Sequence, residues 1–172
     1  MEKFAIPGAG ALIVKEEDGE KYVLLQERWK EKAPEENGML EIPAGKVREF
    51  ESIYDTLRRE VLEETGLDIV EIYGEDQTLL YSHGQYRVIN FTPFACSQNL
   101  AGKYPIMVFV FICEAEGDLL GSSDESQNYK WMTMGELGRR MGADPKGFCP
   151  MHVGTLQRIV RSTMKRLSPK QK

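Results

Sequence analysis

The chain has 172 residues, which at roughly 150 residues per domain corresponds to one domain. Apolar residues make up 41% of it, and 27 acidic against 22 basic side chains give a net charge of −5. Because nucleic-acid-binding proteins are usually basic over their contact surface, this balance argues against a nucleic-acid partner. The longest apolar runs, such as residues 106–113, are far shorter than the roughly 18 residues that suggest a membrane span. The first residues also lack a signal-peptide pattern, so we expect a cytoplasmic protein.

The cysteines and the lack of linkers also indicate a cytoplasmic protein of one domain. Cys96, Cys113 and Cys149 lie far apart without a Cys-x-x-Cys spacing, so we expect three buried thiols and neither disulfides nor a zinc site. No internal repeat or low-complexity tract divides the chain. We therefore expect one continuous domain over residues 1–172, and the sequence leaves open whether it forms a homodimer.

The first elements are predicted to be a β-hairpin. Residues 9–14 and 22–26 are apolar runs on either side of a polar segment that contains Asp18-Gly19, and Asp-Gly is a strong hairpin signal. A polar loop at 29–38 and a short apolar segment at 39–42 follow. After Pro43 the chain enters a turn that contains glycine.

The spacing of apolar residues then changes to that of a helix. Its apolar side chains recur at every third or fourth position: Phe50, Tyr54, Leu57 and Val61. Ser52, followed three residues later by Asp55, resembles a capping box, and Gly66 stands where a left-handed residue ends a helix. The pattern predicts a helix over residues 52–65.

The second half of the chain alternates strands and helices. Segments at 69–73, 77–82, 86–95 and 106–115 are rich in apolar residues, and the last is nearly unbroken, as in a central strand. Residues 136–141 and 154–166 are predicted to be helices. Strands interrupted by one internal helix and followed by helices predict a mixed α/β sandwich.

Three carboxylates share one face of the predicted helix at 52–65. At 100° per residue Glu60, Glu63 and Glu64 fall within an arc of about 100°, beside the apolar stripe. Such like charges disfavour an isolated helix by roughly 0.2–0.5 kcal/mol per pair, and by more where they are partly desolvated. Mg²⁺ offsets this repulsion, because it takes carboxylate oxygens together with substrate phosphates as ligands. A bare Glu-x-x-Glu-Glu more often belongs to a solvated surface helix. The residues around it must therefore show whether this helix binds metal.

Those surroundings resemble a known signature. The residues Gly45-x5-Glu51-x7-Arg59-Glu60-Val61-x-Glu63-Glu64-x-Gly66-Leu67 are similar, at all nine defined positions, to the box of the MutT-like Nudix hydrolase superfamily. That box is Gly-x5-Glu-x7-Arg-Glu-U-x-Glu-Glu-x-Gly-U, with U an aliphatic residue. The order of elements resembles the family over about residues 4–141, and a C-terminal helix is expected at about 154–167. The resemblance implies an α/β/α sandwich with a mixed β-sheet and a catalytic loop-helix-loop.

The resemblance also implies an activity and a set of site residues. It implies an enzyme that needs Mg²⁺ or Mn²⁺ and hydrolyses a nucleoside diphosphate linked to another moiety, so its partner is a nucleotide-derived small molecule. The implied metal ligands are Glu60, Glu63, Glu64 and the backbone carbonyl of Ala44. Arg59 would hold the glutamates, Glu51 would orient the helix and the loop, and Gly45 would allow close backbone packing.

The general base is left open between a glutamate of the box and one from a later loop. Glu125, six residues before Trp131, is the first choice. The alternative is that residues 124–125 belong to an ordinary acidic loop.

Other candidate residues have structural interpretations beside functional ones. His83 and His152 are expected in packing or surface positions in preference to catalysis. Residues 148–152 are interpreted either as a lid over the substrate or, more simply, as a connection that caps the last helix. Phe94 and Tyr104 flank a polar loop at 97–103 and are interpreted either as base-stacking residues or as the edge of the core. The basic tail, Lys165, Arg166, Lys170 and Lys172, is expected to be a solvated helix end.

Three alternatives to the favoured activity remain. They are a non-catalytic nucleotide sensor or regulatory module, a house-cleaning nucleoside triphosphate pyrophosphatase, and isoprenyl diphosphate isomerisation. The intact box favours an enzyme, and the cysteine arrangement expected for the isomerase is missing.

The substrate signal is weaker than the box. The approach Leu40-Glu41-Ile42-Pro43-Ala44-Gly45 resembles the branch that cleaves ADP-ribose and nucleotide sugars. That branch's proline shortly after the box is absent, because Pro93 lies 26 residues beyond Leu67.

Overall fold

The computed structural model describes residues 2–31 and 34–167, and a mixed β-sheet forms its centre. Five strands cross the sheet in the order β10 (Ser126–Thr133), β2 (Glu20–Arg28), β1 (Ile6–Glu17), β9 (Ile106–Glu116) and β5 (Asp68–Ile72). β1 and β9 are parallel, whereas the other neighbours are antiparallel. Short strands extend it: β3 (Leu40–Glu41) beside β2, β4 (Ala44–Lys46) beside β1, and β8 (Ala95–Gln98) beside β9.

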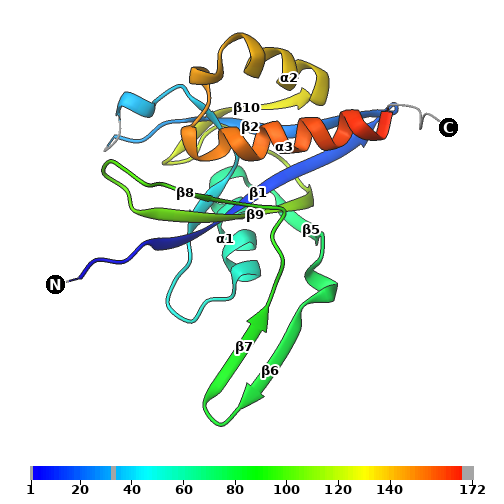
Figure 1. Cartoon of the computed structure of the whole chain (residues 1–172). Coiled ribbons are helices and arrows are strands. Elements are labelled where there is room, and N and C mark those ends of the chain that lie inside the picture. Colours follow the sequence, from blue (N-terminus) through cyan, green and yellow to red (C-terminus); the bar gives the residue numbers. More distant parts are fainter. Residues whose placement is uncertain (1, 32–33, 168–172) are drawn as a thin grey trace.

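Helices cover both faces of this sheet (Figure 1). α1 (Ile53–Thr65) lies on one face, and α2 (Met134–Ala143) and α3 (Pro150–Leu167) lie on the other. Successive residues of β2 alternate between the two cores, with Leu25 packed beside α2 and α3 and Leu24 beside α1. Burying such a side chain stabilises the fold by about 1.5–3 kcal/mol. The predicted α/β/α sandwich with a mixed sheet is confirmed.

The hairpin and the internal helix form where the sequence predicted them. Asp18 and Gly19 both have positive φ angles, 52° and 77°, as a tight hairpin turn requires. The Ser52 side chain accepts a hydrogen bond from the Asp55 amide at 3.0 Å and so caps α1. Gly66 ends the helix at φ 80°, where an added Cβ would lie 2.8 Å from Leu120. Both ends agree with the prediction to within one residue.

The prediction is wrong for one residue of the apolar stripe, Phe50. Phe50 is 99% exposed and has a φ of 60°. It precedes the N-cap residue and lies in a turn, so the helical spacing does not apply to it.

The later elements differ more from the prediction. The strand predicted at 86–95 is two strands, β7 (Tyr86–Asn90) and β8, separated around Pro93, which has no amide hydrogen for a ladder. β8 takes up the start of the loop predicted at 97–103. β10 was not predicted, because its residues are mostly polar. The last helix begins at Pro150, a residue favoured in a first turn, so it takes in residues 150–152, and the buried residues Phe148 and Cys149 lead into it.

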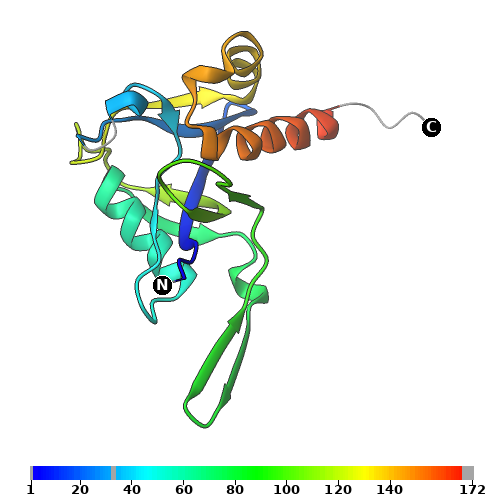
Figure 2. The ribbon, with the colours of Figure 1, turned by 60° about the vertical axis from the view of Figure 1, so that its left-hand side comes forward.

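A separate two-stranded sheet projects from the body, and we call its residues, 79–90, the arm. β6 (Leu79–His83) pairs only with β7 in antiparallel register, and Figures 1 and 2 show the hairpin extending well away from the central sheet. The strands were predicted near these positions, but their separation from the main sheet was not.

The cysteine prediction holds for two of three residues. Cys113 and Cys149 are buried, whereas Cys96 is exposed. Cys96 lies on β8, a short strand that pairs on one side only, with β9. The side chains of Lys165 and Arg166, together with Lys170 and Lys172, lie outside what the structure describes. Among the described helices, none combines the length and apolarity needed to cross a membrane.

Candidate active site on the acidic helix

The three glutamates of α1 differ in how deeply they are buried. The side chain of Glu63 is 53% exposed and that of Glu60 is 16% exposed, while Glu64 is buried as a residue at 5%. The expectation of partial desolvation is confirmed for Glu60 and Glu64 and is wrong for Glu63. The acidic face therefore runs from the core out to solvent.

Glu64 is held from two sides inside the protein. Its Oε2 accepts hydrogen bonds from Gln26 Nε2 at 2.8 Å and from the Ala44 amide at 3.2 Å. Burial raises the pKa of Glu64 to about 8, and the nearby Glu41 carboxylate adds to the rise, against the opposing effect of the Gln26 hydrogen bond. A carboxylate placed in this way gains strongly from any positive charge nearby.

Gly45 leaves the space that Glu60 occupies. A Cβ on Gly45 would lie 1.8 Å from Glu60 Cδ and 2.1 Å from both carboxylate oxygens. The resemblance implied close packing of the backbone at Gly45, whereas the group that comes close is the Glu60 carboxylate. Glu60 therefore lies over Gly45, while Glu64 is bound by the amide of the preceding residue, so both carboxylates reach the Ala44–Gly45 turn.

Arg59 joins the remaining residues of the box. Its Nε and Nη2 donate to the two oxygens of Glu51 at 2.7 and 2.8 Å, and Nη1 donates to Glu60 and, at 3.4 Å, to Glu63. Nη2 also donates to the Lys46 carbonyl at 3.2 Å. The guanidinium thus fixes the helix to the loop before it.

Glu51 lies behind this arrangement. Besides Arg59 it binds the Arg48 amide and the Thr56 hydroxyl, at 3.1 and 2.8 Å. The hydrogen bonds from Arg59, the largest cause, lower the pKa of Glu51 to about 2. A carboxylate held by four donors has little freedom to turn toward a ligand.

Three residues of the site carried no signal as functional residues in the sequence. Gln26 ends an apolar strand and is fully buried, with its amide on Glu64. The Tyr129 hydroxyl donates to the backbone carbonyl of Glu64, and Ser126 Oγ donates to the same carbonyl at 3.2 Å. Both come from β10, the strand that was not predicted. Only the polarity of Gln26 within an apolar run could have marked it.

Glu125 lies in the loop just before β10, next to Lys30. Its half-exposed side chain forms an ion pair with Lys30, and its carbonyl accepts a hydrogen bond from the Trp29 amide at 2.8 Å. Lys30 is also close enough to Glu64 for its charge to lower the pKa of that carboxyl. Lys30 therefore links the loop of Glu125 to the buried glutamate.

The other candidates are not part of this group. His83 is exposed at the end of β6, and His152 is buried, with Nδ1 accepting from the Ile42 amide at 3.3 Å. Burial lowers the pKa of His152 to about 3, so its ring is neutral. Phe94 packs against the core beside α3, with the Arg158 guanidinium 5.1 Å from its ring, and Tyr104 is 42% exposed.

His152 belongs to a second cluster of potential metal ligands. Its ligand atom lies within 4.8 Å of those of Glu41 and Cys149, all three buried. Arg28 already forms an ion pair with Glu41 at 2.9 Å, and burial raises the pKa of the Cys149 thiol to about 11. The guanidinium of Arg28 and the protonated thiol of Cys149 both disfavour the binding of a cation. The three residues therefore serve as part of the packed interior.

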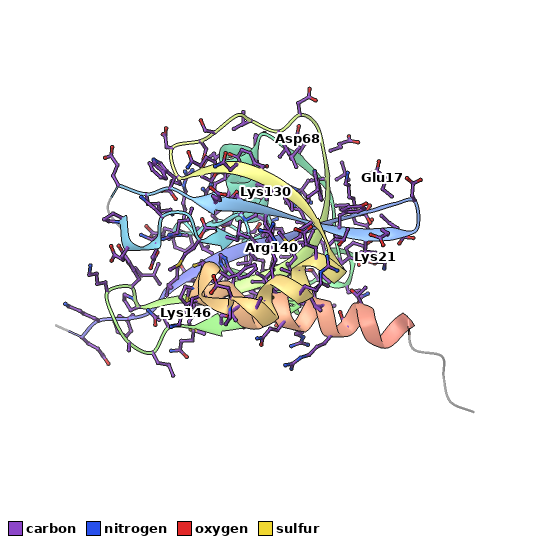
Figure 3. All side chains as sticks on the ribbon, turned by 90° about the horizontal axis from the view of Figure 1, so that it is seen from above. Glu17, Lys21, Asp68, Lys130, Arg140 and Lys146 are labelled. Atoms are coloured by element: carbon purple, nitrogen blue, oxygen red, sulfur yellow. The ribbon has the colours of Figure 1, made fainter. Side chains whose placement is uncertain are left out.

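A cleft of about 340 Å³ lies on the other face of β2. Its lining includes Glu27, Lys130, Arg140 and Asp144, and Figure 3 shows Lys130 and Arg140 on this side of the molecule. Lys130 pairs with Glu27 at 3.2 Å and Arg140 with Glu136 at 3.1 Å. Glu27 directly follows Gln26 in the strand, so the two side chains point to opposite faces. The cleft is separate from the acidic helix.

An acidic helix held against a glycine turn by one arginine, on an α/β/α sandwich, defines a Nudix-type site. The sequence matches the NUDIX domain over residues 5–149, so the chain belongs to the NUDIX-domain family. As a Nudix hydrolase, the protein acts on phosphoric anhydride bonds.

Solved structures share this fold at low sequence identity. The MutT protein of Methanosarcina mazei Go1 is 23% identical, with 95% of this chain and 98% of that chain covered and a TM-score of 0.58. An Ap4A hydrolase of C. elegans is 17% identical, covers 94% and 99%, and gives a TM-score of 0.56. The NUDIX domain of Shewanella oneidensis NrtR, solved with ADP ribose, is 15% identical, covers 97% and 91%, and gives 0.63. No curated protein matches the sequence.

We predict that Gly45→Ala lowers the free energy of unfolding by about 1–3 kcal/mol, because the new methyl group overlaps the Glu60 carboxylate. Urea unfolding measures this difference. The matched control is Gly142→Ala on α2, where a Cβ meets nothing within 4 Å and alanine favours the helix. Equal stability of the Gly45→Ala and wild-type proteins would contradict the close approach.

We predict that Glu64→Gln stabilises the metal-free protein at pH 8 and has little effect at pH 4.5. The pKa of Glu64 is about 8 in the folded state, against an ordinary glutamate value of 4.5. Below pH 4.5 both states are protonated, and as the pH rises toward 8 only the unfolded state loses its proton. The wild type therefore loses stability over this window, by up to about 1.4 kcal/mol per pH unit.

Thermal unfolding in EDTA at the two pH values measures the effect of Glu64→Gln. Glu63→Gln is the control, because it removes the same charge from a half-exposed position one residue earlier. A pH-independent difference between the Glu64→Gln and wild-type proteins would contradict the burial argument.

Proposed function

We propose that the protein is a divalent-metal-dependent pyrophosphohydrolase that cleaves a nucleoside diphosphate linked to another moiety. The observation that carries the proposal is the placement of Glu60 and Glu64 at the Ala44–Gly45 turn, one over Gly45 and the other on the Ala44 amide. Two carboxyl groups that approach one short backbone segment present several oxygen atoms to the same place. Such oxygens are the ligands that Mg²⁺ takes, together with the phosphates of a substrate.

The proposed metal ligands are Glu60, Glu63, Glu64 and the carbonyl of Ala44. Mg²⁺ or Mn²⁺ bound there would neutralise phosphate charge and acidify a coordinated water. Burial of Glu64 fits this role, because its charged form is unfavourable without a nearby cation. Arg59 and Glu51 would position the helix, since their two-point ion pair fixes α1 to the loop before it. Arg59 donates to Glu60 Oε1 and Glu63 Oε2, which leaves the second oxygen of each carboxylate without a bond from Arg59.

Glu63 would complete the set from the solvent side. It is half exposed, and Arg59 and Arg48 approach it only at 3.4 and 3.7 Å. Its loose contacts leave it able to turn toward a ligand, in contrast to Glu51.

We assign the general base to Glu125. The carboxylate is half exposed, so water and substrate can reach it, and its ion-pair partner Lys30 lies close enough to Glu64 to lower the pKa of that carboxyl. In this role it would accept the proton of the attacking water as the new bond to phosphorus forms. The rival base is a glutamate of α1.

The substrate class rests on weaker support. The similar solved structures are a MutT protein, an Ap4A hydrolase and a domain bound to ADP ribose. The names of the last two both include a nucleotide derivative. The Leu40–Gly45 approach favours ADP-ribose or a nucleotide sugar. Its glutamate, Glu41, is however buried and paired with Arg28, so in this chain that residue supports the fold.

We expect the purified protein with Mg²⁺ at mildly alkaline pH to hydrolyse at least one compound of a panel. The panel contains ADP-ribose, nucleotide sugars, dinucleoside polyphosphates, and ordinary and oxidised nucleoside triphosphates. Reaction in ¹⁸O-water followed by mass spectrometry identifies the phosphorus that is attacked. Inactivity on the whole panel together with tight calorimetric binding would favour a sensor without turnover. Release of pyrophosphate from triphosphates alone would favour the house-cleaning activity.

Single substitutions test the metal ligands. Glu60→Gln, Glu63→Gln and Glu64→Gln should each lower kcat by a factor of about 10²–10³, because each removes a charged carboxylate from the reacting centre. Glu20→Gln, at the start of β2, is the control for loss of one charge. A variant that keeps the wild-type rate would remove its residue from the proposed set.

A second pair of variants tests the base. Glu125→Gln should lower kcat by about 10²–10⁴ and remove the acid limb of its pH profile, while KM changes little. Asp124→Asn, one residue earlier in the same loop, should behave as the wild type. An unchanged pH profile in Glu125→Gln would assign the base to the helix.

A further inference from the structure

The arm exposes an apolar face to solvent. In its register Leu79 pairs with Asn90, Tyr81 with Val88, and His83 with Tyr86, so these side chains share one face. Leu79, Tyr81, Tyr86 and Val88 are 70, 63, 65 and 45% exposed. The opposite face carries the pairs Ser82–Arg87 and Leu80–Ile89, of which Leu80 is 56% exposed and Ile89 packs against the core. Four large apolar side chains thus lie together on one side of a two-stranded hairpin.

The base of the arm is fixed to α1. Tyr54 of α1 forms a hydrogen bond with Thr78, just before β6, at 2.6 Å. Its ring also packs edge-on against Phe91, just after β7, with centroids 6.4 Å apart. The guanidinium of Arg58 binds both oxygens of Glu75 at 2.9 and 2.6 Å. The arm therefore projects from a fixed base, and of its own residues Ile89 packs against the core beside α1.

Such a hairpin needs a cover. An isolated two-stranded hairpin is marginally stable in water, and soluble monomers rarely expose contiguous apolar patches above a few hundred Å². The two tyrosines alone expose on the order of 250 Å², taking about 200 Å² for each side chain. In a symmetric pair the same patch is buried on both copies, so its area counts twice toward the roughly 1,600 Å² of a standard interface.

The distribution of charge favours a second copy of the chain as the partner that covers the apolar face of the arm. The chain has 27 acidic residues, yet none lies between Gln77 and Cys113, and the arm itself carries Arg87 as its one residue charged at neutral pH. Two copies of a protein with net charge −5 repel each other over most of their surfaces. The arm is a surface where they can meet without opposing carboxylates.

We propose that the protein is a symmetric homodimer in which the apolar faces of the two arms pack against each other across a two-fold axis. The contact joins two twisted two-stranded sheets face to face, with Tyr81 and Val88 at its centre. Leu79 and Tyr86 lie toward its two ends. On the opposite faces Ser82 and Arg87 stay in solvent, and Ile89 stays on the core of its own chain.

Sedimentation equilibrium of the full chain tests this proposal. We expect the wild type at micromolar concentration to have twice the chain mass of 19.6 kDa. Tyr81→Asp and Leu79→Asp should each raise the dimer dissociation constant at least about thirtyfold, because each places a carboxylate in an apolar interface. Ser82→Asp, on the opposite face of the same strand, should leave the constant unchanged.

Circular dichroism tests whether the variants still fold. Neither Leu79 nor Tyr81 belongs to either core, so each variant should keep the wild-type spectrum, and two variants at different points of one face guard against local misfolding. A monomeric wild type would overturn the proposal, as would a dimer that survives both face variants. The measurement needs no substrate, so its outcome is independent of the proposed hydrolysis.

Discussion

The ion pair between Arg59 and Glu51 is the interaction on which the site depends. Four acidic side chains near one helix cannot approach one another in a poorly solvated region without a counter-charge. Arg59 supplies that charge through five hydrogen bonds, to three carboxylates and to the Lys46 carbonyl. Its planar guanidinium spans both oxygens of Glu51, which a lysine could not do. The helix and the glycine turn are thereby held in a fixed position relative to each other.

Burial and charge act in opposite directions along this helix. The side chains that pack α1 against the sheet, Leu57 and Val61, are fully enclosed, and Glu64 follows them into the interior. The sheet compensates with the Gln26 amide, and β10 holds the helix end through Tyr129 and Ser126. The fold thus retains a carboxylate whose charged form it disfavours. Such tension between stability and local charge is typical of functional sites.

The sequence predicted the parts of the fold that depend on local patterns. The Asp18-Gly19 turn, the caps of α1 and the apolar run of β9 each depend on neighbouring residues, and each was placed within about two residues. Phe50 and β10 were missed, because their environments are set by a turn and by pairing with β2. Within the site, the box marked the carboxylates and Arg59. The roles of Gln26, Tyr129 and Lys30 depend on contacts between distant segments, which spacing does not reveal.

The attachment of the arm divides α1 into two mechanical halves. Tyr54 and Arg58, in the first turns, carry the base of the arm, whereas Glu60 and Glu64, in the last turns, are held by the glycine turn and the sheet. Arg59 ties the junction between the halves to Glu51. The surface that projects from the protein and the carboxylates of the site therefore share one helix but no anchoring contact.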